Sequence, residues 1–224
     1  MLKNKVTPAI GFSDTGEPAV PMDFLYKSPV ILERGNFRNV GKIHEDLLVT
    51  AHAHYEKECV DCKRPAVEVL EITTKDANPE NSTHFDEIIE RLDKLHPIQR
   101  PVLVISYAEG YHLTRFLRRF TSEPIRFTMG IAHLTQVLDE KHYNHLAGGF
   151  VEGLARLIGA GVKIYVYPME CAALAEHLQN HSDEIWVVPD KGLATVANIH
   201  PVNATRHLYS YLFETGSLLP ISIA

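Results

Sequence analysis

Six short apolar runs alternate along this sequence with amphipathic segments of helical length. Each run is rich in Val, Ile and Leu and is bounded by turn-forming residues, which suits a buried strand better than a helix. Strands separated by helix-length segments predict a parallel sheet covered on both faces. We therefore expect an α/β fold with a doubly wound, mainly parallel, Rossmann-like sheet. The expected strands span residues 29–34, 66–72, 101–105, 124–129, 162–167 and 184–188.

The segments between the runs repeat apolar residues at steps of three and four, as helices with one buried face do. These helices are expected to begin near residues 41, 85, 111, 131, 143, 171 and 205. Residues 1–28 carry several prolines and glycines with little periodicity, and they predict an irregular leader or linker. The remainder, 29–224, is expected to form a single α/β domain.

Composition excludes several classes of partner. The formal charge of −6 offers no basic surface for duplex nucleic acid, so no nucleic-acid partner is expected. No apolar run approaches the roughly 20 residues that span a bilayer, and the first 14 residues lack the apolar core of a signal peptide. We expect a cytoplasmic protein without a membrane partner. The oligomeric state stays open, with a homo-oligomer as one outcome.

The stretch from Pro29 to Leu48 joins an apolar strand to a helix through a glycine-bearing turn. Gly35 and Asn36 let the backbone turn at low steric cost. The helix that starts after Gly41 then points its free N–H groups back over the end of the strand. Such a helix start favours an anion, so this turn is the first candidate ligand site.

The same turn resembles the G-x-F-x-x-x-H-x-G-H signature of the nucleotidylyltransferases, the superfamily that includes nicotinate-nucleotide adenylyltransferase. Gly35, Phe37 and His44 fall in register with that signature. Gly41 replaces the first histidine, and Ile43 replaces the glycine between the two, so the H-x-G-H motif is degenerate.

Two later segments extend the resemblance. The strand and turn at 126–134 are similar to the G-x-D-x-L turn that the family places under ATP, with Gly130 retained and Ala132 in place of the aspartate. The segment before the last helix resembles the family's triphosphate-binding segment, with Thr205 and Arg206 at the comparable place.

The resemblance implies adenylyl transfer from ATP, with Mg²⁺, to a phosphate-bearing small molecule such as nicotinate or nicotinamide mononucleotide, and a role in NAD biosynthesis. It implies His44 and Lys42 as catalytic residues. The nucleotide-binding residues that it implies are Gly35, Asn36, Phe37, Gly130, His133, Thr205 and Arg206. The alternative is a non-catalytic nucleotide-binding or regulatory domain on the same fold. For the single side chains the alternative is structural: a packing role for His44, a solvated Lys42 and a helix-start role for His133.

Residues 52–62 contain H-x-H-x4-C-x-x-C, which has the ligand types that zinc prefers. The two histidines, His52 and His54, lie two residues apart in an expected helix and therefore point to different faces. We expect no metal here. Cys59 and Cys62 are expected to be reduced thiols, because three cysteines do not suggest a disulfide framework in a chain of this length.

Overall fold

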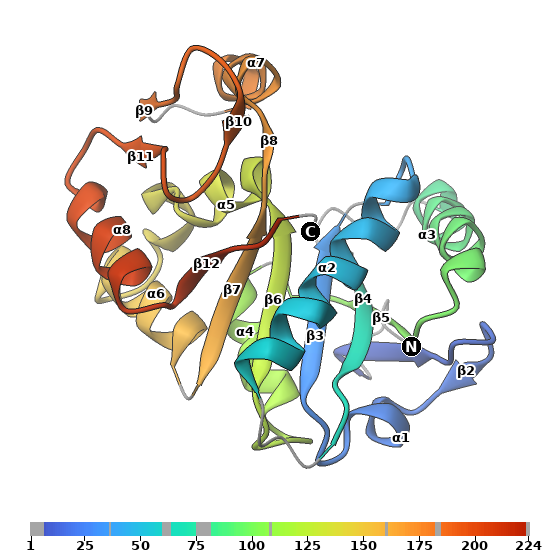
Figure 1. The fold of residues 1–224 in the computed structure, drawn as a ribbon. Coiled ribbons are helices and arrows are strands. Elements are labelled where there is room, and N and C mark those ends of the chain that lie inside the picture. Colours follow the sequence, from blue (N-terminus) through green and yellow to red (C-terminus); the bar gives the residue numbers. More distant parts are fainter. Residues whose placement is uncertain are drawn as a thin grey trace. The chain divides into compact units, whose positions relative to one another are not determined.

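A computed structural model describes residues 7–35, 37–59, 64–74, 82–107, 109–159, 161–181 and 185–222. The chain adopts an α/β fold whose strands are mainly parallel and are flanked by helices (Figure 1), as the alternation of apolar runs and amphipathic segments predicts. It divides into two compact units, 1–125 and 126–224, which we call the N-terminal and the C-terminal unit.

The N-terminal unit is built on the strand order β3-β4-β5-β1-β2. Its elements are β1 (Ala9–Phe12), β2 (Pro18–Ala19), α1 (Pro21–Leu25), β3 (Val30–Gly35), α2 (Lys42–Glu58), β4 (Val67–Thr73), α3 (Ser82–Leu95), the 3-10 turn η1 (His96–Ile98), β5 (Val102–Ile105) and α4 (Gly110–Leu117). Strands β3, β4 and β5 are parallel, while β1 pairs antiparallel with β5 and β2. The stretch before Pro29 thus contains two strands and a helix.

The C-terminal unit has the strand order β12-β7-β6 and two small two-stranded sheets. Its elements are β6 (Ile125–Gly130), α5 (Ile131–Val137), the 3-10 turn η2 (Glu140–Tyr143), α6 (Gly149–Ile158), β7 (Val162–Tyr167), β8 (Met169–Glu170), α7 (Cys171–His181), β9 (Trp186–Val187), β10 (Leu193–Ala194), β11 (His200–Pro201), α8 (Thr205–Glu214) and β12 (Leu218–Pro220). Strand β12 runs parallel to β7.

The apolar runs are buried because both faces of their strands are covered. Ile31, Leu70 and Ile105 are fully buried in β3, β4 and β5, and Ile164 is fully buried in β7. Helix α2 crosses one face of β3 and β4 (Figure 1) and buries its own apolar stripe, including Leu48. This is the pattern of strands that are apolar on both sides and helices that are apolar on one.

The sixth expected strand, 184–188, does not join the parallel strands as predicted. The run at 184–188 contributes only β9, which pairs antiparallel with β11 in a separate two-stranded sheet. Val187 and Ile185 are exposed, so this run is covered on one side at most. An apolar run specifies extended backbone, but the partner strand depends on long-range packing.

Across the described ranges no helix is both long and apolar enough to cross a membrane.

Candidate functional site

The carboxyl ends of β3, β4 and β5 are the place where a ligand site is expected in a parallel sheet. Here β3 departs from its apolar pattern and ends in Glu33, Arg34 and Gly35. Because neighbouring residues of a strand point to opposite faces, Glu33 and Arg34 project to opposite sides of the sheet. Each side chain enters a polar network of its own.

Glu33 faces helix α2 and pairs with a histidine in its first turn. The Nδ1 atom of His44 lies 2.5 Å from Oε1 of Glu33, and Oε2 of Glu33 is buried without a hydrogen-bond partner. The Glu33 side chain is 4% exposed and that of His44 is 19% exposed. The second ring nitrogen of His44, Nε2, has only a weak contact of 3.4 Å with the carbonyl oxygen of Asn39. The pair is therefore a buried carboxylate that orients a partly accessible imidazole.

Both groups titrate abnormally. Burial raises the pKa of the Glu33 carboxyl, and the interaction with His44 offsets only part of this effect. The hydrogen bond with Glu33 raises the pKa of His44 above 6.5, against the opposing effect of partial burial. Two neighbouring groups with perturbed pKa values at a strand end are characteristic of sites that transfer protons.

The loop between β3 and α2 is packed against neighbouring side chains. Phe37 is buried, has a left-handed backbone (φ 47°) and places its ring 5.1 Å from that of His44. Gly35 has no room for a side chain, since a Cβ atom would lie 2.8 Å from Cζ of Phe37. Lys94 of α3 donates a hydrogen bond of 3.0 Å to the carbonyl oxygen of Arg38. Lys42, the first residue of α2, is exposed.

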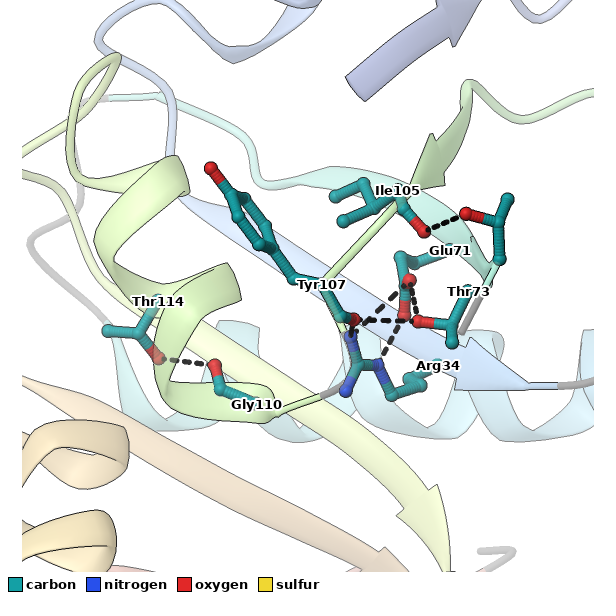
Figure 2. Close-up of polar contacts among 8 residues, drawn as sticks. Arg34, Glu71, Thr73, Ile105, Tyr107, Gly110 and Thr114 are labelled. Carbon is teal, nitrogen blue, oxygen red and sulfur yellow. Dashed lines mark hydrogen bonds and ion pairs between the residues drawn. The ribbon is translucent and has the colours of Figure 1, made fainter. Parts of the chain in front are cut away.

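On the opposite face, Arg34 joins the ends of three chain segments (Figure 2). Its guanidinium forms an ion pair with Glu71 of β4, and its Nη2 donates to the carbonyl oxygen of Tyr107 at 3.0 Å. The hydroxyl of Thr73 contacts the same two partners, Oε1 of Glu71 at 2.8 Å and the carbonyl oxygen of Tyr107 at 3.0 Å. Glu71 is completely buried, so this network fixes the strand ends that carry the Glu33–His44 pair.

Four of the sequence-predicted residues lie in the C-terminal unit. Gly130 precedes α5 as its N-cap residue, and His133 lies in the first turn of that helix. Thr205 is buried at the start of α8 and both its amide and its hydroxyl contact Oδ1 of Asn203. Arg206 is exposed at the rim of a hollow of about 140 Å³ beside α8. The structure thus brings Gly35, Phe37 and His44 together in one unit, and it places these four in the other. Asn36 lies outside the described residues.

The H-x-H-x4-C-x-x-C segment does not form a ligand cluster in the described part of the chain. His52 pairs instead with Glu68 of β4, with Nδ1 2.6 Å from Oε1, and Glu68 also pairs with Arg100. Within the described ranges, no group of three or more His, Cys, Asp or Glu residues is placed to hold a metal. Cys59, expected to be a free thiol, is disulfide-bonded, and Cys62 lies outside the described residues.

Glu33, Arg34, Glu71 and Tyr107 carry the polar architecture of this sheet edge, and none was predicted from the sequence. The available signal was the charged residues inside strands: Glu33 and Arg34 end one apolar run, and Glu71 interrupts the next. Strand carboxylates are almost never fully buried unless they are paired, so these positions predict partners. The sequence does not say which residues those partners are.

Comparison with known proteins gives no family. No protein-family model matches the chain, and no curated protein matches it. A solved structure from Mesorhizobium loti, assigned to the HAD-like phosphatases, has a TM-score of 0.33 and 11% sequence identity over 72% of this chain and 81% of that chain. This is a distant similarity that carries no statement about activity.

These findings correct the prediction of a nucleotidylyltransferase. No family model and no curated protein supports membership of that superfamily. The physical reason lies at the motif. The histidine that supports the resemblance is held by a buried glutamate of the preceding strand, and Gly35 and Phe37 fit each other in a packed turn. The predicted adenylyl transfer and the role in NAD biosynthesis are withdrawn.

Proposed function

We propose that this protein is a hydrolase of small phosphate monoesters in which His44, oriented by Glu33, transfers the proton. The observation that carries the proposal is the Glu33–His44 pair at the carboxyl end of β3. A carboxylate that binds one ring nitrogen of a histidine leaves the other nitrogen as the reactive one, which is the arrangement of acid–base histidines in enzymes.

The proposed chemistry follows from the raised pKa of His44. The raised pKa favours the protonated imidazole, whose Nε2–H can donate its proton to the oxygen that leaves when water attacks the phosphorus atom. Glu33 balances the charge of the imidazolium and holds the ring by Nδ1. Such proton transfer typically contributes 10²–10⁴-fold to a rate. In this scheme Glu33 is a positioning residue and His44 is the catalytic one.

The preference for a phosphate rests on the start of α2. This helix has 17 residues, and its N-cap residue, Gly41, has no side chain that could satisfy the free N–H groups of the first turn. These N–H groups and the protonated imidazole both favour a negative charge. The exposed ammonium of Lys42 adds a second positive charge at the same helix start.

The test is a comparison of two histidines on the same helix. His44→Gln should lower kcat/KM for p-nitrophenyl phosphate or a nucleoside monophosphate by about 10²–10⁴-fold. His52→Gln removes a histidine that also pairs with a strand glutamate but lies two turns further along α2, and it should leave kcat/KM unchanged. In the wild type, kcat/KM should fall as pH rises through the raised pKa of His44. Glu33→Gln should move this fall to lower pH.

Two results would refute the proposal. One is a purified, folded wild-type protein that hydrolyses none of a panel of phosphate monoesters above the uncatalysed rate. The other is activity that His44→Gln and His52→Gln reduce equally, which would make the Glu33–His44 pair a structural contact.

A further inference from the structure

Two histidines lie side by side on helix α7, outside the site described above. His177 and His181 are four residues apart, and their ring centroids are separated by 4.8 Å. His181 is exposed and His177 is half-buried. Residues four positions apart lie on the same face of a helix, one turn above the other, so both imidazoles point from α7 in the same direction.

A third polar group faces this pair from a neighbouring helix. Helix α5 packs against α7, and Nε2 of Gln136 lies 3.5 Å from Nε2 of His177. The two ends of an amide side chain are nearly equivalent in shape, so rotation of Gln136 by half a turn presents its oxygen to the same point. The described residues place no third His, Cys, Asp or Glu beside the pair.

We propose that His177 and His181 form a binding site for a borderline divalent transition metal such as Ni²⁺ or Zn²⁺. Neutral imidazoles at i and i+4 of a helix present two nitrogen ligands on one face, and imidazole nitrogen suits these ions. The amide oxygen of Gln136 and water complete the coordination. The net charge of −6 favours a cation at an exposed position of this chain.

The spacing of the histidines makes the proposal testable by titration calorimetry with NiCl₂ alone. The full-length wild-type protein should bind one Ni²⁺ ion at α7. Either His177→Ala or His181→Ala should weaken this binding on the order of 10²-fold, because two-point chelation becomes single-point binding. His207→Ala removes an exposed histidine from α8 and should leave the binding unchanged.

A relocated histidine provides the matched control. The double variant Gln179→His/His181→Ala keeps the number of histidines but places them two residues apart, where they point to different faces of α7. It should bind Ni²⁺ as weakly as His181→Ala. The exchanged positions lie on the exposed surface of α7, so far-UV circular dichroism should match the wild type for every variant.

The proposal is overturned if His177→Ala/His181→Ala binds Ni²⁺ with the wild-type affinity and stoichiometry. It is also overturned if the relocated variant binds as tightly as the wild type, because the two-histidine geometry would then make no contribution. Neither result bears on the proposed hydrolase, whose residues lie on β3 and α2.

Discussion

Removing the charge of Arg34 should destabilise the protein strongly, because its carboxylate partner has no access to water. Glu71 is fully buried, and the Arg34 side chain is only 13% exposed. In Arg34→Met the Glu71 carboxylate loses the one cationic partner that it has among the described residues. It keeps the hydrogen bond from the hydroxyl of Thr73. Leaving one partner of a buried ion pair uncompensated typically costs about 3–5 kcal/mol. A typical domain has about 5–15 kcal/mol in total, so this loss is a large part of its stability.

Two further variants separate the contributions to the loss of stability in Arg34→Met. Thr73→Val removes one hydroxyl, which donates within this network, and should cost about 1 kcal/mol. The double variant Arg34→Met/Glu71→Leu removes both charges, and its loss should be smaller than that of Arg34→Met alone, since no unpaired charge remains. Arg64→Met is the control. Arg64 is exposed and donates a hydrogen bond of 3.2 Å to the carbonyl oxygen of Lys27, so the loss of stability in this variant should stay within about 0.5 kcal/mol.

The assay is urea unfolding followed by far-UV circular dichroism, with the slope of free energy against urea compared between variants. The reasoning is refuted if Arg34→Met loses less than about 1 kcal/mol at an unchanged slope, or if the double variant loses at least as much as Arg34→Met alone. Either result would mean that the buried carboxylate of Glu71 does not depend on Arg34.

Two further predictions concern pH and packing. The folded-state pKa of His44 lies above its unfolded value of about 6.5, so the stabilisation from its proton is complete below that pH and is lost as pH rises through the folded pKa. The raised pKa of Glu33 acts in the same direction from pH 4.5 upward, so the contribution of the Glu33–His44 pair to the free energy of unfolding should fall as pH rises. The free energy of unfolding of the wild type minus that of Glu33→Gln should therefore fall as pH rises, and a constant difference would contradict this. Gly153→Ala should destabilise the C-terminal unit by about 1–3 kcal/mol or more, because its Cβ atom would lie 2.0 Å from Cδ1 of Tyr143. Gly130→Ala, with open space around the new methyl group, should be nearly neutral when both variants are compared by urea unfolding.

Much of the local structure follows from the sequence alone. Strands β3 to β7 and most of the helices between them appear within a few residues of the expected ranges, since apolar runs and helical periodicity are properties of neighbouring residues. The helix expected from residue 143 is the exception, because α6 begins only at Gly149. The position of His44 at a helix start after a strand and a glycine turn was predicted for the same reason.

The partners were decided by the tertiary structure. Glu33 meets His44 and Arg34 meets Glu71 and Tyr107 because parallel pairing of β3 with β4 sets Arg34 opposite Glu71, and α2 returns over the other face. Strand β9 pairs with β11 instead of extending the parallel strands, and β1 pairs with β5. The residues of these strands do not by themselves identify the partner strand. Local sequence specifies which backbone is extended and which is helical. Register and long-range packing specify which side chains meet, because they depend on residues that are far apart in the sequence.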